Sequence, residues 1–190
     1  MGMLRASRAT AGESSRIQDK AGAEYLFRFA ASDDVDTIAS IESDGYPSDE
    51  AASLESMRFR QEKAPGAFMV AVRQDSGKHD EIGGYVCGTC TTASKLEHES
   101  MSNHVPEGKT LCIHSVCVRK DLMRKGLGSA MLKTYLKHMP GALPHVKECR
   151  LICKEHLIGF YTEAGFRLDG ESDIVHGRDP WFELSYFFDE

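Results

Sequence analysis

A β-rich run that leads through a basic, glycine-containing loop into a long helical pattern constrains the fold more than any other feature. The run is Thr110–Val118, the loop is Arg124-Lys-Gly-Leu-Gly-Ser129, and the helical pattern continues to Met139. Two glycines at the start of a helix let backbone N–H groups converge on an anion, and the helix dipole adds positive potential. This unit predicts a site for a phosphate-bearing ligand, although short Gly-x-Gly turns are common and the loop alone is weak evidence.

Strand and helix patterns alternate along the chain from Tyr25 onward. Ser32 is expected to cap a first helix and Ser48 a second, while the long helix is expected to end at Pro140. Strands are expected at residues 25–30, 67–73, 81–91, 110–118, 149–153, 166–168 and 181–188. The resulting order, β-α-α-β-β-β-α-β-α-β-β, predicts an α/β domain in which helices cover both faces of a mixed sheet.

Composition narrows the class of protein. The chain has 190 residues and a net charge of −6, and an acidic chain is a poor general binder of nucleic acid. No window approaches the roughly 18 apolar residues that cross a bilayer, so no membrane span is expected. Residues 1–22 are rich in Ala, Ser, Arg and Gly, which predicts a flexible tail before a domain over residues 23–190. No apolar leader opens the chain, so a cytoplasmic location is expected.

The six cysteines raise the question of a metal site. Cys87 and Cys90 have the spacing of half a zinc site, but they lie in a strand-like run, where residues three apart face opposite ways. Cys149 and Cys153 lie in another strand-like run and form no zinc knuckle. We therefore expect buried, reduced thiols and no metal site.

Two segments together suggest a family. Residues 111–129, followed by Phe160-Tyr-Thr-Glu-Ala-Gly-Phe166, resemble the GNAT acetyltransferases, in which such a unit holds the pyrophosphate of acetyl-CoA. Four segments resemble non-vertebrate arylalkylamine (serotonin) N-acetyltransferases: residues 110–118, 151–157, 46–52 and 175–181. The resemblance spans about residues 24–188. It implies a mostly antiparallel mixed sheet with helices on both faces, splayed at the acetyl-CoA site.

His114 is the first candidate catalytic residue. An amine acceptor arrives as an ammonium ion, and a histidine that titrates near neutrality can take its proton, directly or through water. The resemblance matches His114 to one of two catalytic histidines, while Cys112 stands where vertebrate members have the other. Alternation along an extended strand places Cys112, His114 and Val116 on one face. A hydrogen-bonded core histidine, and Cys112 as an acyl carrier, are the alternatives left open.

Tyr161 is the second candidate. It follows Phe160 within a helical pattern, so packing in the core is one interpretation. The resemblance implies instead that Tyr161 donates a proton to the departing CoA thiolate, a task for which a phenol with a pKa of about 10 is suited.

The resemblance implies a cofactor site built largely from backbone groups. A bulge and splay at the strand leave groups free to pair with the pantetheine arm, much as an added strand would. The expected residues are Val116, Cys117, Val118, Arg124, Lys125, Gly126, Leu127, Gly128 and Ser129. Met123 stands where the family has a polar residue, so weakened CoA affinity is expected.

The acceptor site is expected at Tyr46 and Pro47, which resemble the family's mobile substrate lid and could flank a planar arylethylamine. A helix–helix turn with a surface aromatic is the alternative. Trp181 is expected in the core, and His156 and His176 are given no role.

The expected function is acetyl-CoA-dependent N-acetylation of a small-molecule primary amine by direct attack in a ternary complex. Serotonin, tryptamine or phenethylamine would be typical acceptors. A polyamine or peptide-amine acetyltransferase and a CoA-binding module without turnover are the alternatives, and the oligomeric state is left open.

Overall fold

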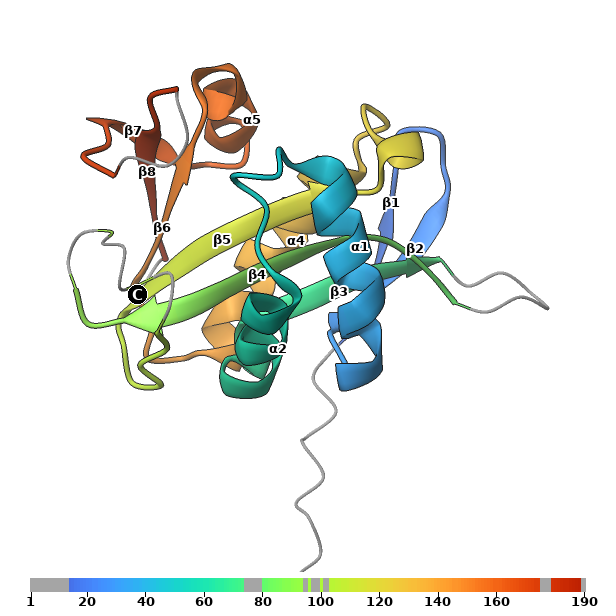
Figure 1. Ribbon diagram of the computed structural model, residues 1–190, viewed down its shortest axis with the longest axis horizontal. Helices are drawn as coiled ribbons and strands as arrows, with labels where there is room; N and C mark the ends of the chain where they lie inside the picture. Colours follow the sequence, from blue (N-terminus) through green and yellow to red (C-terminus); the bar gives the residue numbers. More distant parts are fainter. Residues whose placement is uncertain are drawn as a thin grey trace, which may run out of the picture.

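The computed structural model describes residues 14–73, 80–93, 96, 100, 103–174 and 179–188. They form an eight-stranded sheet in the order β1-β2-β3-β4-β5-β6-β8-β7 (Figure 1). The strands are β1 (Ser15–Gln18), β2 (Glu24–Phe29), β3 (Phe68–Arg73), β4 (Glu81–Thr91), β5 (Thr110–Val118), β6 (Glu148–Cys153), β7 (Arg167–Glu171) and β8 (Phe182–Phe187). Every neighbouring pair is antiparallel except β5 and β6, which are parallel. The expected mixed, mostly antiparallel sheet is confirmed.

Helices cover both faces of this sheet. The helices α1 (Val35–Gly45) and α2 (Leu54–Lys63) lie on one face, and α4 (Leu127–Ala142) lies on the other (Figure 1). A short helix, α5 (Ile158–Thr162), follows β6. Short 3-10 turns lie at Ser32–Asp34, Pro65–Ala67, Lys120–Leu122 and Glu155–Leu157. Each face has its own apolar core, with Met131 of α4 in one and Ile38 of α1 in the other. The strand and helix order that the sequence predicts is therefore present, with β1 in addition.

The helix α4 carries the apolar stripe that its sequence predicts. Leu127, Met131, Leu132, Tyr135 and Leu136 are all buried. The Tyr135 hydroxyl donates to the carbonyl of Ala67 at 2.9 Å, which ties the helix to the start of β3. The helix continues to Ala142 instead of ending at Pro140. A proline in the last turn removes only its own N–H group, so the turn can close around it.

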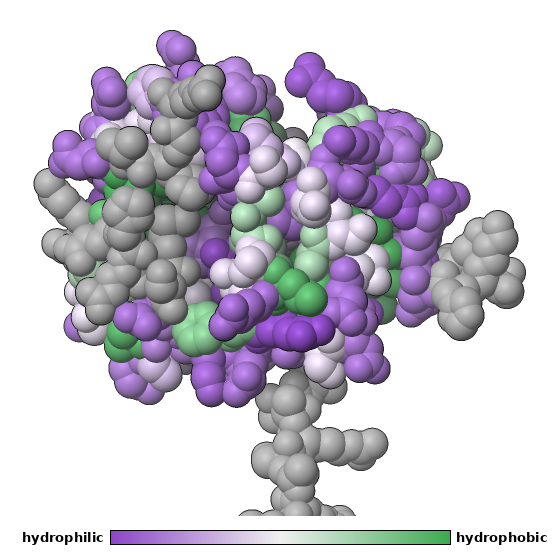
Figure 2. All heavy atoms as spheres, viewed as in Figure 1, coloured by the Kyte–Doolittle hydropathy of each residue, from purple (hydrophilic) through white to green (hydrophobic). Residues whose placement is uncertain are grey.

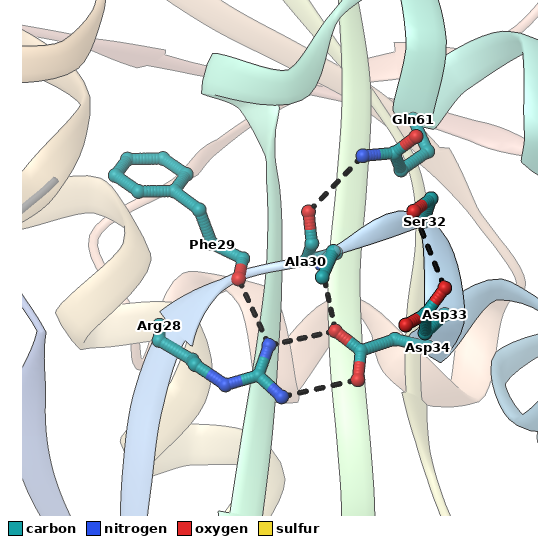
Figure 3. Close-up of polar contacts among 8 residues, drawn as sticks. Arg28, Phe29, Ala30, Ser32, Asp33, Asp34 and Gln61 are labelled. Carbon is teal, nitrogen blue, oxygen red and sulfur yellow. Dashed lines mark hydrogen bonds and ion pairs between the residues drawn. The ribbon is translucent and has the colours of Figure 1, made fainter. Parts of the chain in front are cut away.

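The starts of α1 and α2 do not lie at the expected serines. Asp34 accepts from both terminal nitrogens of Arg28, at 2.6 and 3.0 Å, and from the Ala31 amide at 2.7 Å (Figure 3). Ser32 caps nothing, because it lies inside the 3-10 turn that precedes α1. The cap of α2 is Ser53, which accepts from the Ser56 amide, so the helix begins five residues later than a cap at Ser48 would require.

The first strand begins before residue 23, where the domain was expected to start. Ser15–Gln18 form β1, which pairs with β2 along its whole length. In the turn that follows, the Lys20 amide donates to the carbonyl of Lys125 at 2.7 Å. The sheet therefore begins inside the segment 1–22 that was expected to be a tail, while residues 1–13 lie outside the described residues.

The sheet opens between β5 and β6. These strands pair only at Thr110–Glu148, Leu111–Cys149 and Cys112–Arg150, and they separate beyond Cys112. On its other side β6 remains paired with β8 through Cys153. The expected splay is therefore confirmed, and it leaves the second half of β5 with an unpaired edge.

The Asp34 cluster yields a stability prediction. Asp34→Ala removes three hydrogen bonds at a partly buried carboxylate, so the free energy of unfolding in urea should fall by about 2 kcal/mol. Asp33→Ala is the matched control, because Asp33 is exposed and should change stability by less than about 0.5 kcal/mol. Equal losses in the two variants would contradict the role given to Asp34.

Candidate active site

A cleft of about 830 Å³ lies where β5 and β6 separate. Its walls come from α1 and the segment after it, the second half of β5, the end of β6, and α5. On the outer face above α1 and α2, apolar residues are scattered in small groups among hydrophilic ones (Figure 2). The cleft is lined by both His114 and Tyr161, although the two are 47 residues apart in the sequence.

A β-bulge places His114. Cys87 pairs with Ser115 and Gly88 with Ile113, which leaves His114 as the extra residue of β5. Ser115 donates to Glu42 of α1, and His114 lines the cleft together with Glu42 and with Arg60 of α2. Both side chains therefore face α1 and α2. The expected alternation is wrong beyond the bulge, because Val116 packs against the core under α4.

The hydrogen bonds of Thr89 define the protonation of the His114 ring. The Thr89 hydroxyl donates to the carbonyl of Ser100 at 2.9 Å, and its oxygen lies 2.7 Å from Nε2 of His114. A hydroxyl has one proton to donate, so Nε2 of His114 carries the hydrogen of this second bond. Nδ1 is then the bare nitrogen of the neutral ring, which makes it the atom able to accept a proton.

The environment of His114 keeps it neutral. Burial lowers the pKa of His114 well below its usual value, and the positive charge of Arg60 lowers it further. Both causes disfavour the imidazolium form. At neutral pH the ring is therefore uncharged and available as a base.

Tyr161 lies on α5 with only 7% of its surface exposed. Its ring makes edge contacts with Phe160 and Phe166, at centroid distances of 4.9 and 5.9 Å. Burial raises the pKa of Tyr161, so its phenol remains protonated at neutral pH and can donate a hydrogen bond into the cleft.

Cys112 is placed poorly for nucleophilic chemistry. It is fully buried, packs with Leu96 and Ile174, and is absent from the cleft lining. Burial raises the pKa of its thiol to about 12, which leaves almost no thiolate at neutral pH. His114 directs Nε2 at Thr89. These observations weigh against an acyl-carrying role.

The open edge of β5 exposes backbone groups of alternate residues. The Arg119 amide donates to the carbonyl of Gly83, and antiparallel hydrogen-bonded pairs recur at every second residue. Cys117 therefore pairs with Tyr85, and the N–H and C=O groups of Val116 and Val118 point toward the splay. Of the expected residues, Cys117 accordingly has its backbone groups engaged by β4.

The glycine loop lies beyond the cleft that contains His114. Val118 and Met123 line the cleft, whereas residues 124–129 do not. Gly126 caps α4 in the left-handed conformation, with φ of 85°, and no side chain caps the helix. The first N–H groups of a helix have no partner within it, so those of Leu127, Gly128 and Ser129 are left available to an anionic group. Together with the open edge of β5, these N–H groups fit an elongated ligand with phosphates at one end.

The acceptor-side residues also line the cleft. The Tyr46 hydroxyl donates to the carbonyl of Val116 at 3.4 Å, while Pro47 is exposed. Trp181 was expected in the core but is only partly buried and lines the cleft, with Lys154 Nζ 4.0 Å from the centre of its ring. His156 lines the cleft as well. His176 lies outside the described residues.

Five charged residues of the cleft lining were missed from the sequence: Glu42, Glu50, Arg60, Lys154 and Asp179. Glu42 and Arg60 are buried, and Glu50 forms a 3.1 Å ion pair with Lys154. Glu42 could have been found, because it falls four residues after Ile38 on the apolar face of its helix, where a carboxylate is unexpected. Arg60 gave no comparable signal, since α2 has little apolar periodicity.

The described residues provide neither a cluster of metal ligands nor a membrane-spanning helix. Among the described residues, no three His, Cys, Asp or Glu side chains are grouped to hold a metal ion. Cys87 and Cys90 belong to the cores on opposite faces of the sheet, as their spacing predicts. In the same part of the chain, no helix is long and apolar enough to span a membrane.

The sequence matches one family model and is similar to two curated proteins. The model of the acetyltransferase (GNAT) family matches residues 35–166. Serotonin N-acetyltransferases from Mesocricetus auratus and Macaca mulatta are 31% and 30% identical over 100 residues, which is 53% of this chain. The chain spans about half the length of these relatives, 48% in each case.

Solved structures share the fold. The loading GNATL domain of CurA from Lyngbya majuscula superposes with a TM-score of 0.73 at 14% identity, covering 86% of this chain and 97% of that one. The structure of yncA from Salmonella typhimurium with acetyl-CoA gives 0.61 at 16% identity, covering 87% and 95%.

The environment of His114 can be measured directly by NMR. We expect the ring to remain neutral at pH 6, where a free imidazole is mostly protonated, with the hydrogen on Nε2. Arg60→Gln removes a cation and should raise the pKa of His114. Arg58→Gln should not, because Arg58 is exposed on the same helix. A protonated ring at pH 6 in the wild type would contradict the assignment.

Proposed function

The chain belongs to the acetyltransferase (GNAT) family, and we propose that it transfers the acetyl group of acetyl-CoA to a primary amine. The observation that carries the proposal is the cleft at the splay, which brings together a neutral imidazole and a protonated phenol. An arylalkylamine is the proposed acceptor. The relatives named serotonin N-acetyltransferase support this choice, as do Tyr46 and Trp181 in the cleft lining.

The residues present fit acetyl-CoA. Val116 and Val118 offer backbone groups along the open edge of β5, where a pantetheine arm can pair as an added strand. The N–H groups of Leu127, Gly128 and Ser129 would bind the pyrophosphate, and the exposed Arg124 and Lys125 add positive charge. For pantetheine to pair with Val116, the Tyr46 hydroxyl must leave the carbonyl that it contacts.

Two side chains would handle the protons. In the reaction the amine nitrogen bonds to the thioester carbonyl carbon, the carbon–sulfur bond breaks, and CoA leaves as a thiolate. An acceptor that arrives as an ammonium ion loses two protons in all. His114 takes the first at Nδ1, directly or through water, which frees the nitrogen lone pair for attack. Tyr161 donates its proton to the thiolate, and the second proton, lost from the nitrogen as the amide forms, restores the phenol through solvent. The Val116 amide, which points toward the splay, polarises the carbonyl.

A panel of amines tests the proposal. With acetyl-CoA, tryptamine, serotonin and phenethylamine should each give a kcat/KM at least about tenfold above that of spermine, because the cleft is lined by aromatic rings. Preference for spermine would indicate a polyamine acetyltransferase. Binding of acetyl-CoA without turnover of any amine would indicate a non-catalytic module.

The proposed acid and base should differ in pH dependence. Tyr161→Phe removes only a hydroxyl, so acetyl-CoA affinity should persist while kcat falls by on the order of 10²-fold. His114→Ala should also lose turnover near neutrality. Its activity should partly recover as the pH approaches the pKa of the amine, because the acceptor then arrives deprotonated. Tyr161→Phe should show no such recovery. Equal, pH-independent losses would indicate that both residues are structural.

A further inference from the structure

A buried carboxylate projects from α1 into the wall of the cleft. Glu42 is only 2% exposed, yet it lines the cleft together with its partner Ser115. One oxygen accepts from the Ala52 amide at 3.0 Å and from the Ser115 hydroxyl at 3.2 Å. The other oxygen accepts from the Tyr85 hydroxyl. These three donors hold the carboxylate in a fixed position and stabilise its negative charge.

In the described part of the chain, no cation lies within ion-pair distance of Glu42, because none of the ion pairs there involves it. Arg60, the buried cation of α2, donates from Nη1 to the Cys87 sulfur at 3.7 Å. Buried charges are normally paired, because removing an ion from water costs several kcal/mol. An unpaired carboxylate at a cleft therefore favours a cationic ligand.

The cleft lining has two other carboxylates, and they show the contrast. Glu50 lines the same cavity, but Lys154 lies 3.1 Å from its Oε1 and pairs with it. Asp179 also lines the cavity, but it is exposed, so water solvates its charge. Of these three, Glu42 is the one that is buried and lies in no ion pair of the described residues. Its oxygens can accept about four hydrogen bonds, of which three are used, so one acceptor site remains.

We propose that the Glu42 carboxylate binds the ammonium group of the acceptor. The inference rests on the proposed function, because a primary amine with a pKa of about 10 arrives protonated. Ser115, which bridges to Glu42, is adjacent to His114 on the bulge of β5. The charged amine is therefore held beside the base that removes its proton. Glu42 would thereby select amines as acceptors and disfavour neutral analogues of the same shape.

A pair of ligands isolates this role. Tryptamine and tryptophol share the indole and the two-carbon chain, but tryptophol ends in a neutral hydroxyl. Calorimetry on the CoA-bound protein should give wild-type binding at least about tenfold tighter for tryptamine, the usual gain from a charge-assisted hydrogen bond. Glu42→Gln should bring the ratio to within about twofold. Glu42→Asp, which keeps the charge, should retain much of the preference.

Asp44→Asn is the matched control, since Asp44 is an exposed carboxylate of the same helix and does not line the cleft, and it should leave the ratio unchanged. In steady-state assays Glu42→Gln should raise KM for tryptamine and leave KM for acetyl-CoA unaffected. Thermal unfolding confirms that each variant is folded. An undiminished preference for tryptamine in Glu42→Gln would overturn the inference. Failure of the wild type to acetylate any amine would instead refute the proposed function, while the binding ratio could still be measured.

Discussion

The early end of pairing between β5 and β6 is the constraint on which the site depends. Three residue pairs join the strands, and beyond Cys112 they diverge while β6 stays paired with β8. The divergence leaves the N–H and C=O groups of Val116 and Val118 facing the opening. It also creates the cleft into which α5 brings Tyr161. A sheet paired along its full length would leave no edge and no cavity.

The bulge in β5 determines which side chains reach that cleft. One extra residue shifts the phase of the strand, so that His114 and Ser115 both face α1 and α2. Each then meets a polar partner from another element, Thr89 of β4 for His114 and Glu42 of α1 for Ser115. Burial beside Arg60 lowers the pKa of His114 and keeps it neutral. The position and the protonation state of His114 thus follow from its contacts with neighbouring elements.

The sequence predicts the bounds of individual strands, but it misses features that depend on contacts between elements. The bounds of β4 and β5 match the expected runs, because long stretches rich in β-branched and apolar residues leave little choice of structure. Ser32 and Ser48 were wrong as caps, since Asp34, held by Arg28, directly precedes α1, and Ser53 caps α2. The bulge at His114 depends on register with β4, which no single strand encodes. His114 and Tyr161 were found through a family resemblance. Glu42 was missed, although the helical pattern places it on the apolar face of α1.

Hydrogen exchange at individual amides of β5 tests most directly whether acetyl-CoA adds to the open strand edge. We expect acetyl-CoA to slow exchange at Val116, Val118 and the first turn of α4. Cys117, whose amide already faces β4, should change little. Protection confined to other strands, or equal protection of Cys117 and its two neighbours, would contradict this expectation.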